Sequence, residues 1–480
     1  MKSKIGEIII DDNYPFKNCK LGRVKYAEVL TKIVSSYKEG AVIAIDGEWG
    51  SGKTTFMKMW RQYLENNSFK TLYFNAWEDD FVSDPIVGLI GQLSKTSGLK
   101  EGIDSVLKTI SKIAVGLIPN VAKNLTQKYL GENVAEILEA TSQGVSDLLF
   151  EEIKQYENQT KSIADFRKEI QKLVKNCSEN KPLVFIVDEL DRCNPHYAVK
   201  VLERIKHLFT VENIVFVLSI DKAQLASSVR GYYGSDTINA EEYLKRFIDL
   251  ELNLPAPNMK DFCTYLYDTF DFDSFFSEEI RNKYHGKDYE KNLFIDMSVA
   301  LFSNLKFNLR QVEKTYTFAR LVMQAFYGEV HVNPEIVLFL IYIRNKDIVF
   351  YENLKNKELD IDTIVKFIED NLPFIVPKFD EEKRTDCNFL ITVIAKFLLC
   401  YSYKVSKNTA IMKGFSYSTV YKLLDKENNK LLFTTKIERN DLLLTDLRRL
   451  ESNGYCREAG IIDLTDMIEH IELMHDLKID

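Results

Sequence analysis

The chain has 480 residues, of which 45% are hydrophobic and 28% charged, and its formal net charge is −8. This length is enough for two or three domains with sizeable cores. The negative balance argues against a protein that coats nucleic acid nonspecifically, although a local basic groove would be compatible with it. The 7 cysteines show no CxxC spacing and no N-terminal stretch resembles a secretory signal, so we expect a cytoplasmic protein with reduced thiols.

The first chemical signal is the apolar strand Val42–Ile45, which leads into the glycine-rich turn GEWGSGKT. The spacing of Gly47 and Gly52 lets successive backbone N–H groups point inward and form an anion nest at the start of the next helix. Lys53 is then expected to reach the β- and γ-phosphates of a nucleoside triphosphate, and the Thr54 hydroxyl to take one Mg²⁺ position. The pattern predicts a nucleotide-binding loop made of Gly47, Glu48, Trp49, Gly50, Ser51, Gly52, Lys53, Thr54 and Thr55.

A helical insertion is predicted over residues 101–180. Its most apolar part, 110–121, is interrupted by a lysine and a proline and is shorter than the roughly 20 apolar residues of a membrane-spanning helix. Residues 134–153 repeat apolar positions at the spacing of one helix face. We therefore expect no transmembrane segment, and an insertion that either packs on the core or offers a face to another subunit or to a membrane surface.

The apolar run Leu183–Val187 ends in Asp188 and Glu189. A run that is apolar at every position is typical of a strand buried on both faces of a parallel sheet, and ligands bind at the carboxyl ends of such strands. Asp188 is therefore predicted to hold Mg²⁺, directly or through water, and Glu189 to orient an attacking water, unless Glu189 is only a solvated residue after the strand. Asp191 and Arg192 form either a local ion pair or part of a nucleotide-dependent subunit contact.

Further strands are predicted at Thr71–Ala76, Asn213–Ile220 and Phe247–Leu254. With the strand before the glycine-rich turn and the acidic strand, they make a five-stranded, mainly parallel sheet in a doubly wound α/β core. Ser219 or Asp221, at the end of one of them, is predicted to sense the γ-phosphate. Asp221 serves equally well as the N-cap of the helix that follows it.

Beyond residue 257 the apolar periodicity is helical rather than strand-like. Arg310, early in one of these helices, is either a second sensor of the γ-phosphate or a surface residue. Arg246 is a candidate arginine finger that reaches a neighbouring nucleotide, where a guanidinium would offset transition-state charge. The predicted organisation is an N-terminal segment 1–40, an NTPase core of 41–100 and 181–257, the helical insertion 101–180, a helical extension 258–344, and a mostly helical regulatory or partner-binding region 345–480.

Several sequence blocks together resemble the KAP P-loop NTPases: GEWGSGKTT, FNAW from Phe74, FIVDELDRCNP from Phe185, and VFVLSID followed by EYLKRFIDLELNLP. The resemblance covers residues 12–256, with the helix around Arg310 as a further extension. It implies an ATPase core of the class that carries a catalytic glutamate. Many members hold paired transmembrane helices in the insertion, which this chain lacks, and the family includes bacterial proteins that exclude phage.

Together these features predict an Mg²⁺-dependent ATP-binding and hydrolysing switch, acting as a homo-oligomer or with a protein partner, and the resemblance implies a role in antiviral defence. ATP is favoured over GTP because the chain has no guanine-reading tetrapeptide of the NKxD or TKxD type. One alternative is a scaffold in which ATP promotes assembly with negligible turnover. Another is a nucleic-acid motor, for which we would expect a stronger basic stripe or aromatics in a basic groove. Glu189 favours the enzyme, because a binding-only module needs no water-orienting carboxylate.

Overall fold

The computed structural model divides the chain into two compact units, one formed by residues 8–257 and the other by residues from 258 onward. Each unit has its own hydrophobic core and is taken separately below. The residues that the structure describes are 8–82, 84–95, 105–106, 109, 148–177, 181–276, 287–303, 307–326, 332–371, 393, 396–398, 400–401, 411–412, 421–424, 431–435 and 464–476.

The first unit is built on a parallel sheet. Its strands are β1 (Ala41–Asp46), β2 (Thr71–Asn75), β3 (Leu183–Asp188), β4 (Ile214–Ile220) and β5 (Leu250–Asn253). They lie in the order β2-β3-β4-β1-β5, and every pairing is parallel, which confirms the predicted five-stranded α/β core. β3 and β4 are buried at every position, as expected for interior strands covered on both faces.

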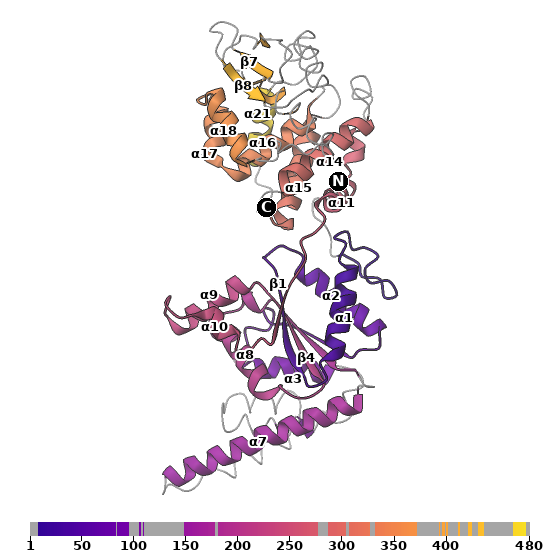
Figure 1. Ribbon diagram of the computed structural model, residues 1–480, viewed down its shortest axis with the longest axis vertical. Coiled ribbons are helices and arrows are strands. Elements are labelled where there is room, and N and C mark those ends of the chain that lie inside the picture. Colours follow the sequence, from indigo (N-terminus) through magenta and orange to yellow (C-terminus); the bar gives the residue numbers. More distant parts are fainter. Residues whose placement is uncertain are drawn as a thin grey trace. The chain divides into compact units, whose positions relative to one another are not determined.

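Helices cover both faces of this sheet (Figure 1). Val184 and Ile186 of β3 share a core with α1 and α2, whereas Phe185 and Val187, on the opposite face, pack with the other helices. The strand therefore buries alternate side chains in two separate cores. The helices of this unit are α1 (Val24–Ser36), α2 (Lys53–Asn66), α3 (Pro85–Lys95), α7 (Leu148–Cys177), α8 (Pro195–Leu208), α9 (Lys222–Tyr233) and α10 (Ala240–Leu244).

The helix α7 belongs to the predicted insertion and has 30 residues. Phe166, Ile170 and Leu173, in its second half, are buried in the same core as α3 and α8. This part of the insertion therefore packs on the core. The apolar segments 110–121 and 134–147 lie outside the described residues. Among the described residues, no helix is both long and apolar enough to cross a membrane.

The second unit is mainly helical. Its helix α16 is buried at every position from Pro334 to Ile343, which is typical of a core helix that is apolar all round. Glu472 of α21 accepts hydrogen bonds from Arg344 at 3.1 Å and Lys355 at 3.0 Å, so the last described helix is tied to α16 and α17. The helices are α11 (Met259–Thr269), α12 (Phe272–Phe276), α14 (Lys287–Ser303), α15 (Leu309–Ala325), α16 (Pro334–Lys346), α17 (Ile348–Lys355), α18 (Ile361–Asn371) and α21 (Leu464–Asp476).

A small antiparallel sheet accompanies these helices. Its strands are β6 (Ile411–Met412), β7 (Tyr421–Leu424) and β8 (Leu431–Thr435), in that order. The sequence predicts a mostly helical region over residues 345–480, and these strands were not predicted from it. Apolar runs of two to five residues are too short for periodicity to separate strand from helix.

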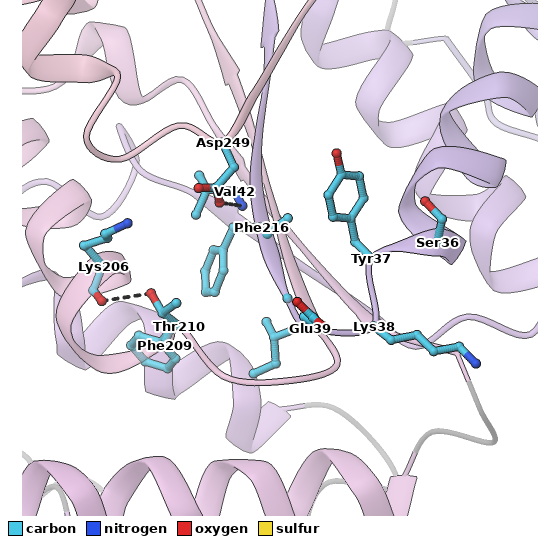
Figure 2. Close-up of a pocket in the computed structure, with 13 residues that line it drawn as sticks. Ser36, Tyr37, Lys38, Glu39, Val42, Lys206, Phe209, Thr210, Phe216 and Asp249 are labelled. Atoms are coloured by element: carbon cyan, nitrogen blue, oxygen red, sulfur yellow. Dashed lines mark hydrogen bonds between the residues drawn. The ribbon is translucent and has the colours of Figure 1, made fainter.

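A pocket of about 480 Å³ lies at the amino edge of the five-stranded sheet (Figure 2). Tyr37 and Lys38 before β1, Phe209 after α8, and Asp249 before β5 line it. The Asp249 carboxylate accepts a hydrogen bond from the backbone N–H of Val42 at 2.8 Å, which ties the starts of β1 and β5 together. Because open α/β sheets bind ligands at the carboxyl ends of their strands, the opposite edge is the better candidate for a functional site.

Gly40 makes the turn into β1 with a φ of +86°, and a Cβ atom there would lie 2.5 Å from the backbone oxygen of Val211. We expect Gly40→Ala to lower the free energy of unfolding by about 3 kcal/mol, because backbone strain and a clash with main chain add. Gly234→Ala is the matched control, since Gly234 also has a positive φ of +65°, but a Cβ atom there would meet no non-neighbouring atom within 4 Å. In Gly234→Ala, backbone strain alone should lower the free energy of unfolding by about 1 kcal/mol, and denaturant-induced unfolding measures both variants. Equal losses for the two variants would contradict the predicted clash.

Candidate nucleotide-binding site

The carboxyl ends of the central strands meet at one edge of the sheet. In β4, Ser219 pairs in register with Asp188 of β3 on one side and with Ile45 of β1 on the other. Asn75, the last residue of β2, pairs in register with Asp188. The strand order therefore places Ser219 between the acidic end of β3 and the glycine-rich loop that follows β1.

The loop has the backbone shape that its glycines allow. Gly50 and Gly52 have φ values of 81° and 82°, in the left-handed region that favours glycine. Gly47 donates its N–H to the Ile220 oxygen at 3.1 Å, and a Cβ atom on Gly47 would lie 3.1 Å from Ser51 Oγ. Gly52 is the N-cap of α2 without a side-chain cap, so the positive end of that helix faces the loop.

Lys53 is the first residue of α2 and is buried, with 8% of its surface exposed. Its ammonium donates hydrogen bonds to the carbonyl oxygens of Gly47 and, at 3.2 Å, Glu48. Burial lowers the pKa of Lys53, and nearby carboxylates, led by Asp191 and Asp221, oppose that shift. The side chain thus folds back over the loop as a desolvated cation among acids. Thr54 and Thr55 follow in the first turn and are half-buried.

Asp188 is buried, and both of its carboxylate oxygens accept hydrogen bonds. The Tyr73 hydroxyl donates to Oδ2 at 2.8 Å, and the Glu189 backbone N–H donates to Oδ1 at 3.0 Å. Burial, followed by the charge of Asp188, raises the pKa of Tyr73, so this hydroxyl keeps its proton. Oxygen ligands suit Mg²⁺, and Asp188 together with the Thr54 hydroxyl would hold it. The described residues contain no cluster of three His, Cys, Asp or Glu side chains arranged as a separate metal site.

Glu189 leaves the strand with a φ of 60°, which is unusual for a residue other than glycine. Its Oε1 forms an ion pair with Arg192 Nη1 at 2.7 Å, and its Oε2 accepts a hydrogen bond from the Asn75 amide at 3.1 Å. Arg192 therefore pairs with Glu189 rather than with its neighbour Asp191. The guanidinium carbon of Arg192 also lies 5.7 Å from the centre of the Trp77 ring. Glu189 is thus a held side chain, with 12% of its side-chain surface exposed.

Trp49 connects the loop to the acidic residues around it. Its indole N–H donates to Asp191 Oδ2, and its backbone N–H donates to Asp221 Oδ2 at 3.2 Å. Asp221 also accepts from the Gln224 N–H at 3.2 Å as the N-cap of α9, as the sequence analysis had proposed for it. Burial raises the pKa of Asp191.

Several buried polar atoms around the loop have no hydrogen-bond partner among the described residues: Ser51 Oγ, Ser219 Oγ and Asp191 Oδ1. Buried polar groups in folded proteins are nearly always hydrogen-bonded. These atoms come from the loop, from β4 and from the turn after β3. Their position suits a polar ligand at this edge of the sheet, which is what a nucleotide with Mg²⁺ requires.

The two predicted arginines belong to other segments of the chain. Arg246 is exposed and stands three residues before Asp249, which belongs to the amino edge of the sheet. It is therefore not part of the site formed by its own chain, and a role toward a neighbouring chain stays a prediction. Arg310 is exposed in the first turn of α15, in the second unit, and its sensor role also stays a prediction.

Tyr73 and Asn75 belong to the site but were not predicted from the sequence. Both lie on β2, and Asn75 is the last residue of that strand. A polar residue at the end of a predicted parallel strand was the signal that could have identified Asn75. Tyr73 carried no such signal, because its contact with Asp188 depends on β2 lying next to β3.

A family model, the KAP family P-loop domain, matches residues 23–324. No curated protein matches the chain. Among solved structures, Drosophila ORC bound to DNA is 12% identical, with a TM-score of 0.39 over 92% of this chain and 98% of that one. The Aeropyrum pernix ORC2 protein in ADPNP-ADP complexes is 13% identical, with a TM-score of 0.31 over 95% of this chain and 94% of that one. A DNA replication initiation factor is 11% identical, with a TM-score of 0.29 over 98% of both chains. Likeness at this level carries no argument about function.

Proposed function

This chain belongs to the KAP family of P-loop domains, and from that premise we propose that it is an Mg²⁺-dependent ATPase acting as a molecular switch. One observation carries the proposal. Lys53, Asp188 and Glu189 converge at the carboxyl edge of the sheet, beside buried polar atoms that have no hydrogen-bond partner among the described residues. Such a set suits a phosphate chain, its metal ion and an attacking water.

Each residue has a distinct task in the proposed reaction. The N–H groups of the loop and the Lys53 ammonium bind the phosphates and offset their negative charge. Bound Mg²⁺ would supply further charge neutralisation, held by Thr54 and Asp188. Glu189 orients the attacking water and accepts its proton. Ser219 lies between the two halves of the site, and its hydroxyl, which bonds to none of the described residues, donates to the γ-phosphate end.

Ser219→Ala tests the role of that hydroxyl. We expect kcat for ATP hydrolysis to fall by about 10- to 100-fold, because one donor to developing charge is lost. The free energy of unfolding should not fall, since the buried Oγ has no hydrogen bond to lose within the part of the chain that the structure describes. Steady-state phosphate release and chemical denaturation measure the two effects. Ser227→Ala on α9 is the matched control and should change neither. A loss of stability with full turnover would assign Ser219 to the core instead.

The proposed function itself is tested by ATP turnover of the purified wild-type chain with Mg²⁺ and with EDTA, alongside Asp188→Asn. We expect turnover that requires Mg²⁺ and is lost in the variant, and slower turnover of GTP. Particle size by light scattering, with and without ATP, completes the test. A wild type that changes size with ATP but never exceeds Asp188→Asn in turnover would establish the scaffold alternative. Turnover that rises only with added DNA or RNA would favour the motor.

The proposal extends to the exclusion of phage, and the family resemblance supports this extension. The test is the plaque count on a phage-sensitive bacterium that expresses the wild type, compared with the same bacterium expressing Lys53→Ala. Fewer plaques with the wild type only would support a nucleotide-dependent defence. Equal counts across a broad set of phages would remove the defensive role while leaving the ATPase untouched.

A further inference from the structure

Both carboxylate oxygens of Glu189 are engaged, which distinguishes this residue from a solvated acid after a strand. The Asn75 amide donates a hydrogen bond to Oε2 at 3.1 Å, and Arg192 Nη1 forms an ion pair with Oε1 at 2.7 Å. A backbone in the left-handed region persists only where surrounding contacts hold it, and such residues gather at functional sites. The contacts that hold Glu189 in this conformation are therefore candidates for a functional role.

Arg192 is itself held by a second contact. Its guanidinium lies over the Trp77 ring, 5.7 Å from the ring centre, a distance suited to a cation–π interaction. Trp77 is the second residue after β2, and its backbone N–H donates to the side-chain oxygen of Asn75 at 3.2 Å. Two neighbouring parts of the chain thus contact Glu189: Asn75 at the end of β2 does so directly, and Trp77 in the turn that follows does so through Arg192.

We propose that Arg192 is a positioning residue for Glu189, and that Trp77 holds Arg192 in place for this task. The inference rests on the proposed ATPase function and adds to it. Each carboxylate oxygen has two lone pairs, so Glu189 can keep the Asn75 hydrogen bond and the Arg192 ion pair and still accept a hydrogen bond from water. An arginine suits this place better than a lysine, because its planar group can stack on the indole while its charge stays beside the carboxylate.

The contact is poorly explained as a device for stability. Arg192 has 28% of its side chain exposed, and it lies only three residues from Glu189. Pairs at this spacing and partial exposure contribute little to folding. Orientation is different, because a displacement of about 1 Å at a reacting group can lower a rate by about 100-fold.

The test uses the full chain and compares Arg192→Met, Arg192→Lys and Trp77→Ala. For Arg192→Met we expect kcat for ATP hydrolysis to fall about 10- to 100-fold while KM changes less than about twofold. Arg192→Lys should recover part of the loss. Trp77→Ala should lower kcat by about two- to fivefold, and should add nothing in the Arg192→Met background, because both act through one contact.

Tryptophan emission of the protein without nucleotide gives a readout independent of turnover. The difference spectrum between wild type and Trp77→Phe isolates the emission of Trp77. The same difference is then measured between Arg192→Met and the double variant that carries both Arg192→Met and Trp77→Phe. We expect the two difference spectra to differ, because a cation over an indole alters the emission of that indole. Phe81→Ala and Arg230→Met are the matched controls, an exposed aromatic and an arginine on α9, and both should leave kcat and the spectrum unchanged.

The results distinguish a failure of the positioning role from a failure of the proposed ATPase function. If the wild type turns over ATP but Arg192→Met has the same kcat, or if the losses of Arg192→Met and Trp77→Ala multiply, the positioning role is overturned and the ATPase stands. If the wild type does not exceed Glu189→Gln in turnover, the proposed function fails first and the inference fails with it.

Discussion

Replacing Lys53 with alanine should weaken ATP binding by about 100-fold and reduce hydrolysis to background. Two charge-assisted hydrogen bonds to phosphate account for about 3 kcal/mol of binding free energy, which converts to that factor. The structure places the ammonium over the loop, where it contacts the carbonyls of Gly47 and Glu48. Titration with a fluorescent ATP analogue and phosphate release would measure both effects.

Lys53→Ala needs a control for general damage to α2. Lys58 lies on the same helix and is exposed, so Lys58→Ala removes a lysine without touching the loop. We expect it to bind ATP within about twofold of the wild type, as most surface substitutions do. Binding by Lys53→Ala at wild-type strength would show that the loop N–H groups suffice and that the lysine acts only later, in turnover.

The sequence was most informative where one local pattern determines the structure. The glycine spacing of the loop and the fully apolar runs of β3 and β4 depend on few neighbours, and the structure confirms these strands. Single-sequence reasoning could also place Ser219 at the correct strand end. These features follow from local backbone preference and from burial, and predicting them does not require knowledge of the strand order.

Contacts between segments that are distant along the chain could not be predicted from the sequence. Tyr73 and Asn75 meet Asp188 and Glu189 only because β2 pairs with β3, and more than 100 residues separate the two strands. Arg192 illustrates the same limit over a short range. The pattern offered Asp191 as its partner, but the left-handed turn at Glu189 brings the glutamate to the guanidinium instead.

Glu189→Gln should separate binding of ATP from its hydrolysis. Glutamine keeps the shape of the side chain and an oxygen that can accept from Asn75, but it cannot take a proton from water. We expect turnover to fall by about 100- to 1,000-fold, within the range for loss of a general base. ATP binding should stay equal or become tighter, because a negative charge near the phosphates is removed. Single-turnover hydrolysis and equilibrium binding distinguish these effects.

A matched control exists because Asn75 contacts two glutamates. Its amide also donates to Glu78 at 2.8 Å, and Glu78 is exposed on the turn after β2. Glu78→Gln removes a carboxylate from the same amide without touching the end of β3, so turnover should stay within about threefold of the wild type. If Glu78→Gln instead abolished turnover and Glu189→Gln did not, the water-orienting carboxylate would be Glu78 after β2 and not Glu189 after β3. If Glu189→Gln bound ATP, changed particle size and did not hydrolyse, the switch would be captured in its ATP-bound state.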